Sequence, residues 1–111
     1  MTETISIQDF ARMELRIGRI TDVRDHPNAD KLYVMDCDLG PELGTRQMVA
    51  GLKPYMPADA LMGQLVVVVA NLEPAPLRGV QSQGMLLAAQ DGSPVVALTV
   101  AAPVAPGSKV R

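Results

Sequence analysis

A run of β-branched residues near the middle of the chain constrains the fold more than any other feature of the sequence. It reads Leu65-Val-Val-Val-Val-Ala70 and is apolar on both of the faces that a strand would have. Valine is stiff at χ1 and favours strands, and a strand with two apolar faces has to be covered on both sides. The run therefore predicts a buried strand at the centre of a β-structure.

Shorter strand patterns flank this run at spacings of about ten residues, as in small barrels and sandwiches. In one of them, Tyr33, Met35 and Cys37 share the face that stays apolar, which predicts that they point inward. Asp91-Gly92 is a strong hairpin signal between the last two patterns. With a single helical turn predicted at 57–63, the series indicates an all-β barrel. The predicted strands cover residues 14–25, 32–38, 45–50, 65–70, 84–89 and 95–100.

Local signals predict the ends and bends of this barrel. Ser6, followed three positions later by Asp9, forms a variant of the capping box, so we expect a short opening helix with Phe10 packed into the core. Gly18 breaks the phase of the first strand, which predicts a bulge or a sharp bend there. The stretch 71–79 contains two prolines and is predicted to be a loop.

Length and composition define the class of protein. A chain of 111 residues is typical of one compact domain, so we expect a single domain over residues 1–111. Hydrophobic residues make up 48% and charged residues 20%, a balance that excludes an intrinsically disordered chain. The apolar stretches are too short for a membrane span of roughly 20 residues, and the first residues show no secretory signal. A cytoplasmic protein with no membrane partner is therefore expected.

The charged residues are unevenly distributed. The net charge of -2 argues against a generally basic nucleic-acid-binding protein but allows a local basic patch. Only five of the 22 charged residues lie after position 63, so the second part of the chain is unusually apolar. A small domain with this much apolar surface is expected to associate with itself.

Neither a catalytic site nor a metal site is indicated. A nucleophile elbow requires G-x-S-x-G, whereas the segment 79–84 has one residue too many before Ser82, and the lone histidine, His26, is remote in sequence. Zinc requires several His or Cys ligands, and the chain has one of each. Asp36 and Asp38 share a strand face and could hold a hard cation, but a solvated acidic edge is the simpler interpretation. We therefore expect no catalytic residue, no metal and no cofactor.

A set of polar residues at strand edges indicates binding instead. Lys31, Arg46 and Arg78 stand at the ends of predicted strands, and uncharged donors and acceptors surround them. Arg and Lys contact phosphates, while Asn, Gln and Ser contact ribose hydroxyls and base edges. Ordinary polar turns remain the alternative interpretation. The uncharged members of the set are Pro27, Asn28, Gln47, Ser82 and Gln83.

The aromatic content limits how a nucleic acid would be recognised. Barrels that bind single strands without sequence preference stack bases on aromatic rings, and this chain has only Phe10, Tyr33 and Tyr55. Recognition is therefore expected to depend on folded shape and on the backbone.

Several segments resemble the tRNA-binding domain family, in order and over nearly the whole chain. They are DFARMELRIGRI at 9–20, HPNADKLYVMDCDLG at 26–40, RQMVAGLKPY at 46–55, LVVVVANLEPAPLRGVQSQGMLLAA at 65–89 and PGSKVR at the end. This family occurs as small free-standing proteins and as the C-terminal appendage of bacterial methionyl-tRNA synthetases. The resemblance implies an OB-fold, a five-stranded barrel, with a short N-terminal helix and extra C-terminal strands.

The resemblance also implies a function. Free-standing members of the family are homodimers that bind the outer corner of folded tRNA by shape and have no catalytic activity. The dimer contact in such proteins involves the opening helix and the C-terminal strands. By resemblance, the tRNA-binding positions are Asn28, Lys31, Arg46, Arg78, Ser82, Gln83 and Met85.

The sequence departs from the family at one place. Relatives typically read Lys-Pro-x-Lys-Leu-Arg-Gly where this chain has Glu73-Pro-Ala-Pro-Leu-Arg-Gly79, so two cations are missing and an anion is present. Because each lost phosphate contact weakens binding, we expect weak or strongly salt-sensitive binding of tRNA.

Three roles follow from the resemblance. The first is a tRNA-binding protein that acts in trans for a methionyl-tRNA synthetase. The second is a chaperone-like module that binds protein, as a related branch of the same barrel does, and the seven methionines would suit an adaptable apolar surface. The third is a structural subunit that docks onto a synthetase lacking its own appendage.

Overall fold

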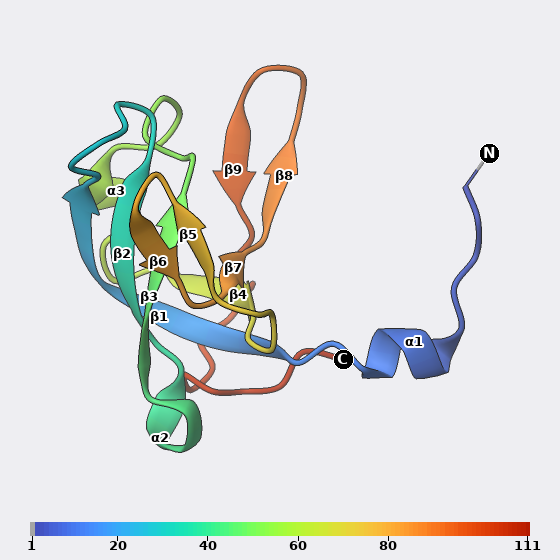
Figure 1. Cartoon of the computed structure of the whole chain (residues 1–111). Helices are drawn as coiled ribbons and strands as arrows, with labels where there is room; N and C mark the ends of the chain where they lie inside the picture. Colours follow the sequence, from blue (N-terminus) through green and yellow to red (C-terminus); the bar gives the residue numbers. More distant parts are fainter. Residues whose placement is uncertain (1) are drawn as a thin grey trace.

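The computed structural model of the protein describes residues 2–111, and its centre is an antiparallel five-stranded barrel (Figure 1). The strand order in the sheet is β3-β2-β1-β4-β7. The chain closes the barrel just before β7, where the backbone N–H of Gln83 donates to the carbonyl of Gln47 on β3 (2.8 Å). This arrangement confirms the all-β prediction and has the form of an OB-fold. The strands are β1 (Leu15–Asp25), β2 (Tyr33–Asp38), β3 (Thr45–Ala50), β4 (Leu65–Val69), β5 (Ala75–Leu77), β6 (Val80–Ser82), β7 (Met85–Leu86), β8 (Ala88–Gln90) and β9 (Val95–Ala97).

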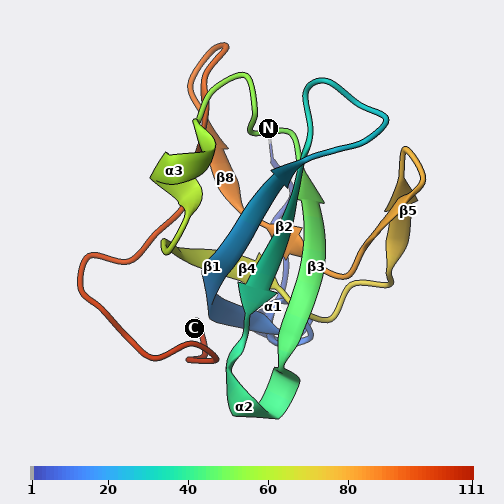
Figure 2. The same cartoon turned by 90° about the vertical axis from the view of Figure 1, so that its left-hand side faces the viewer.

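The interior of the barrel is filled by the alternating apolar residues of its strands. Every residue of β4 is buried, as the run of valines predicts. Tyr33, Met35 and Cys37 of β2 point inward, and their exposed fractions do not exceed 5%. Met48 of β3 and Ile20 of β1 complete this core and are fully buried. The outer face of β1, β2 and β3 is left open (Figure 2).

Three short helices lie outside the sheet. They are α1 (Ile7–Ala11), α2 (Gly40–Leu43) and α3 (Ala58–Leu61). The side chain of Ser6 accepts a hydrogen bond from the backbone N–H of Asp9 (3.0 Å), which confirms the predicted cap. No helix in the described part of the chain has the length and apolar character that a membrane span requires.

The prediction that Phe10 enters the core is wrong. Helix α1 stands away from the barrel and buries none of its residues, and Phe10 itself is only half-buried (Figure 1). A helix of five residues has too little apolar surface to cover a barrel that its own strands already fill.

The bulge predicted at Gly18 is also misplaced. The register between β1 and β2 shifts between Ile20 and Asp22 instead. A Cβ atom at Gly18 would lie 2.4 Å from the Sγ of Cys37 and 2.6 Å from the Cδ2 of Leu39. Gly18 therefore permits a close approach of the strand to the core rather than a bulge.

The prediction that the whole stretch 71–79 is a loop is wrong. Residues Ala75–Leu77 form β5, which pairs with β6 in a separate two-stranded hairpin. Pro76 has no N–H to give to a sheet, but this strand is exposed and lies at an edge, where proline is tolerated. The predicted strand at 84–89 is divided between β7 and β8, and the hairpin at Asp91-Gly92 is confirmed as the β8–β9 turn.

Candidate nucleic-acid interface

Asn28, Lys31 and Arg78 meet where the loop between β1 and β2 touches the turn between β5 and β6; we call these three residues the loop cluster. The Nδ2 of Asn28 donates to the carbonyl of Arg78 (3.3 Å), and the Nη2 of Arg78 donates to the carbonyl of Asn28 (3.1 Å). Lys31 and both of these residues line one open cavity of about 430 Å³. The cluster offers two cations and an amide, which suit phosphate and ribose oxygens, and the carboxylate of Asp30 lines the same cavity.

The conformation of the hairpin turn places Arg78 at its tip. Arg78 and Gly79 link β5 to β6 and both have positive φ, at 54° and 88°. A two-residue hairpin of type I′ requires positive φ at both positions. A bulky residue seldom adopts this conformation, and the hydrogen bonds with Asn28 help to hold Arg78 in it.

His26 links the β1–β2 loop to the β5–β6 hairpin by hydrogen bonds. It is 6% exposed, its Nδ1 accepts from the backbone N–H of Asn28 (2.9 Å), and its Nε2 lies 2.9 Å from the carbonyl of Leu77. These partners assign the proton to Nε2 of a neutral ring. His26 was considered above only as a catalytic base, so its positioning role was missed. The His-Pro-Asn turn is a signal for it, but the partner Leu77 lies 51 residues away.

Arg46 and Gln83 lie elsewhere, around a second open cavity of about 540 Å³. Arg46 pairs with Cys37, toward the α2 end of the β2–β3 pair, and its Nη1 donates to the carbonyl of Ala70. The Oε1 of Gln83 accepts from the backbone N–H of Gln47 (3.1 Å). Glu73 lines this cavity too, so a carboxylate shares it with the guanidinium of Arg46.

Ser82 and Met85 have different surroundings again. Ser82 is 6% exposed, and its Oγ accepts from the N–H of Val49 (3.0 Å) and donates to the carbonyl of Gly84 (3.0 Å). The bond to Val49 holds the end of β6 against β3, and the bond to Gly84 holds the turn between β6 and β7. Met85 is 47% exposed and lines an apolar cavity of about 300 Å³.

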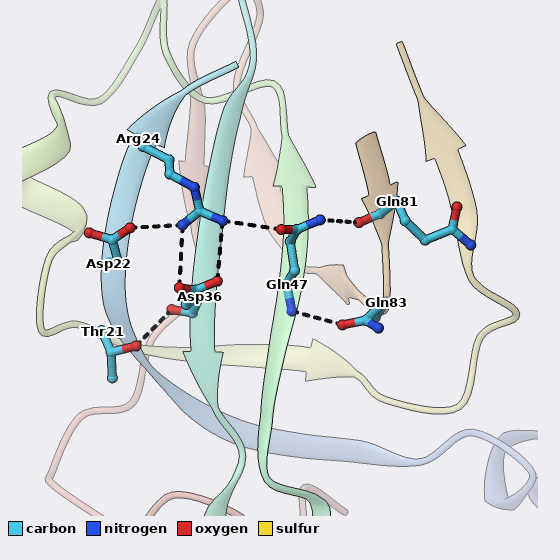
Figure 3. Close-up of polar contacts among 7 residues, drawn as sticks. All are labelled: Thr21, Asp22, Arg24, Asp36, Gln47, Gln81 and Gln83. Carbon is cyan, nitrogen blue, oxygen red and sulfur yellow. Dashed lines mark hydrogen bonds and ion pairs between the residues drawn. The ribbon is translucent and has the colours of Figure 1, made fainter. Parts of the chain in front are cut away.

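A row of polar side chains crosses the outer face of the sheet; we call Asp22, Arg24, Asp36 and Gln47 the strand row (Figure 3). The Nη1 of Arg24 lies 2.7 Å from Oδ2 of Asp22 and 3.3 Å from Oδ2 of Asp36. Its Nη2 donates to Oε1 of Gln47 (3.1 Å). The hydrogen bond to Asp22 is the main cause that raises the pKa of Arg24 above its ordinary value. Sequence reasoning did not find this row, because its members come from three different strands.

The residues considered for other chemistry have structural partners. Asp36 binds Arg24, and Oδ1 of Asp38 accepts from the backbone N–H of Gly40 (2.9 Å). No group of three or more potential metal ligands occurs within residues 2–111. Ser82 and His26 both bond to backbone groups rather than to each other.

Comparison with known proteins places the chain in a family. A model described as "Putative tRNA binding domain" matches residues 15–109. The chain belongs to this tRNA-binding domain family. Methionine--tRNA ligases from Thermococcus onnurineus and Thermotoga maritima contain similar segments, which are 53% identical over 109 residues and 46% identical over 106 residues. The matches cover 98% and 96% of this tRNA-binding domain protein but only 15% and 16% of the two ligases.

Solved structures of similar size share the fold of this tRNA-binding domain. The MetRS related protein from Pyrococcus horikoshii matches with a TM-score of 0.91 and 27% identity, over 99% of this chain and 100% of that one. The chaperone CsaA from Bacillus anthracis matches with a TM-score of 0.88 and 27% identity, over 98% of this chain and 100% of that one. The barrel, the helix α1 and the C-terminal strands are thus covered by both matches.

Proposed function

We propose that this protein is a non-catalytic, cytoplasmic binding protein for folded tRNA, which it recognises by shape and by contacts to the RNA backbone. The observation that carries the proposal is the loop cluster, where reciprocal hydrogen bonds between Asn28 and Arg78 hold the guanidinium of Arg78 on the same cavity as Lys31. Two cations on one rim suit the phosphates of a folded backbone. Stacking is disfavoured because the chain has only three aromatic residues, of which Tyr33 is buried, Phe10 is half-buried and Tyr55 is exposed.

The relatives support a role beside a methionyl-tRNA synthetase. The similar segments belong to methionine--tRNA ligases, of which this chain matches a small part. We infer that the chain acts as a single domain in trans to such a synthetase. Docking onto a synthetase that lacks the segment is a variant of the same role.

We infer further that the protein is a homodimer. Ile5 lies just before the protruding helix α1 and Ile7 lies on it. They expose 69% and 71% of their surface. An open cavity of about 240 Å³ lies between α1 and the C-terminal residues, with Met13, Leu15 and Val110 in its lining. A second copy would cover these apolar side chains and present two loop clusters to RNA, so avidity would strengthen a modest site.

A gel shift with folded tRNA and with a single-stranded RNA of equal length, at two salt concentrations, tests the main proposal. The wild type is expected to retard the folded tRNA and to release it at the higher salt. Arg78→Asn keeps a residue type that tolerates positive φ but removes the cation, so it should weaken the complex several-fold and reduce the salt slope by about 0.9. Arg19→Gln, which removes an exposed cation on β1 whose Nη1 donates to the carbonyl of Gly63, is the matched control. Equal binding of the two RNAs, or equal loss in both variants, would contradict the proposal.

A chaperone-like role is the second candidate, and the apolar cavity beside Met85 favours it. Leu77, Met85 and Val95 contribute to the lining of this cavity. The structural similarity to the chaperone CsaA from Bacillus anthracis is consistent with a protein-binding surface of this kind. Suppression of aggregation of a denatured client protein, lost in Met85→Asp and kept in Arg78→Asn, would favour this role over RNA binding.

A further inference from the structure

The strand row occupies the part of the barrel on which OB-folds commonly hold an extended single strand. That surface is the outer face of the second and third strands together with the adjacent loops. Here it carries Asp36 on β2 and Gln47 on β3, with Asp22 and Arg24 on β1 (Figure 3). The guanidinium of Arg24 has both of its terminal nitrogens occupied, by the two carboxylates and by the amide oxygen of Gln47.

The charge of this row is unfavourable for nucleic acid. Two carboxylates face one guanidinium, so the row is net negative although it contains an arginine. A strand lying along the face would bring its phosphates close to Asp22 and Asp36, and like charges placed opposite each other suppress the wrong partner. Within strands β1, β2 and β3, Tyr33 is the one aromatic residue, and it is buried inside the barrel, so these strands offer no ring on which a base could stack.

Hydrogen bonds fix the row in this arrangement. The Nε2 of Gln47 donates to the carbonyl of Gln81 on β6 (2.8 Å), which turns the Oε1 of Gln47 toward Arg24. The backbone N–H of Gln47 is bound by Gln83, so the β5–β6 hairpin and the row are connected (Figure 3). The guanidinium of Arg24 is therefore held by its partners on the outer face of the sheet, although 42% of the side chain stays exposed.

From this geometry we propose that Asp22 and Asp36 are specificity-determining residues: by neutralising Arg24 they exclude single-stranded RNA from the sheet face and restrict RNA to the loop cluster. The inference rests on the proposed tRNA-binding function. The charge of Asp22 is largely screened at the loop cluster, because Asp22 lies four residues before His26, about 13 Å along an extended chain. That separation exceeds the Debye length of about 8 Å at physiological ionic strength.

The test is the double variant Asp22→Asn/Asp36→Asn, measured with single-stranded oligouridylate and with folded tRNA at physiological salt. The side chains of Asp22 and Asp36 are 49% and 37% exposed, so amides should be accommodated at both positions. A thermal melt checks that the double variant is folded. Affinity for the single strand should rise roughly three-fold or more, with a salt slope steeper by about 0.7, as expected for one gained phosphate contact. Affinity for folded tRNA should change less than two-fold by the screening argument.

Two further variants make the test specific. Adding Arg24→Gln to the double variant should abolish the gain, because the freed guanidinium is its source. Asp59→Asn, on the exposed start of α3, makes the same kind of charge change away from the row and should leave single-strand binding unchanged. An unchanged single-strand affinity in a folded double variant, or an equal gain in Asp59→Asn, would overturn the inference. Failure of the wild type to bind tRNA would instead refute the proposed function, so the two failures are distinguishable.

Discussion

Residues of similar chemistry in this protein have different tasks because their partners and their burial differ. Arg78 extends from a hairpin tip, whereas Arg24 is held by two carboxylates in the sheet. Ser82 and Gln83 are neighbours in sequence, yet the first is buried and the second is exposed. Burial of a hydroxyl is tolerated only when its hydrogen bonds are satisfied, as they are for Ser82.

Replacement of Ser82 by Ala should therefore affect stability before it affects binding. The substitution leaves the buried N–H of Val49 without its acceptor, which should lower the free energy of unfolding by about 1–3 kcal/mol. Urea denaturation measures this loss, and Ser93→Ala, in the exposed β8–β9 turn, is the control. A stable Ser82→Ala protein with weakened tRNA binding would show instead that the hydroxyl contacts RNA.

Cys37 makes stability sensitive to alkaline pH. Burial raises the pKa of its thiol from an ordinary value of 9.0 to about 12. The unfolded thiol then loses its proton between these values while the folded thiol keeps it, so this group's contribution to stability is constant below pH 9 and declines as pH rises toward 12. Cys37→Ala should lose less stability than the wild type between pH 9 and pH 11 in urea titrations, and equal losses would contradict the assignment.

At the scale of elements, the β5–β6 hairpin connects the candidate interface to the barrel. Arg78 of the hairpin and His26 of the β1–β2 loop make the hydrogen bonds between these two segments. Ser82 of the hairpin and Gln47 of β3 make those between the hairpin and β3. Segment 73–76, which runs into β5 of the hairpin, is the place where the family resemblance predicts two cations and the chain has none. Its residues are exposed, so their charges act on a ligand rather than on the core.

Restoring these charges should strengthen RNA binding. The double variant Glu73→Lys/Pro76→Lys should steepen the salt dependence of tRNA binding by about two contacts, each contributing a slope of about 0.9. Filter binding across a salt series measures the slope. Asp91→Lys, in the distant β8–β9 turn, tests whether net charge alone is responsible, and an equal gain there would show that segment 73–76 has no special position.

At the scale of the whole molecule, the most exposed of the large apolar side chains lie on parts that project from the barrel. Helix α1 and the β8–β9 hairpin both extend away from it (Figure 1). Ile5, Ile7 and Val96 on or beside these elements are more than half exposed. Such surfaces are typical of association with another chain.

A charge on α1 should therefore disrupt the proposed dimer. Ile7→Glu should raise the dissociation constant of the dimer by about thirty-fold or more, as at a central contact of an interface, while Ile7→Val should not. Sedimentation at micromolar concentration distinguishes the two species. Affinity for tRNA should fall together with dimerisation, because avidity is lost. A wild-type protein with the mass of a monomer would refute the dimer.

Local patterns in the sequence were enough to predict the strands of the barrel and their inward faces. The valine run of β4, the alternation in β2, the cap at Ser6 and the Asp91-Gly92 hairpin depend on neighbouring residues, so local patterns predict them. The polar and cationic positions could also be found in this way, but their grouping could not.

Which of those residues act together depends on the folded structure. The bonds that join Asn28 to Arg78 and Gln47 to Gln81 connect residues 50 and 34 positions apart. The filling of the core also depends on residues far apart in the sequence. Phe10 was expected in the core, but the strands leave no room there for α1. Local propensity gives no information on such distant pairs, because they form only when barrel closure brings separate strands together.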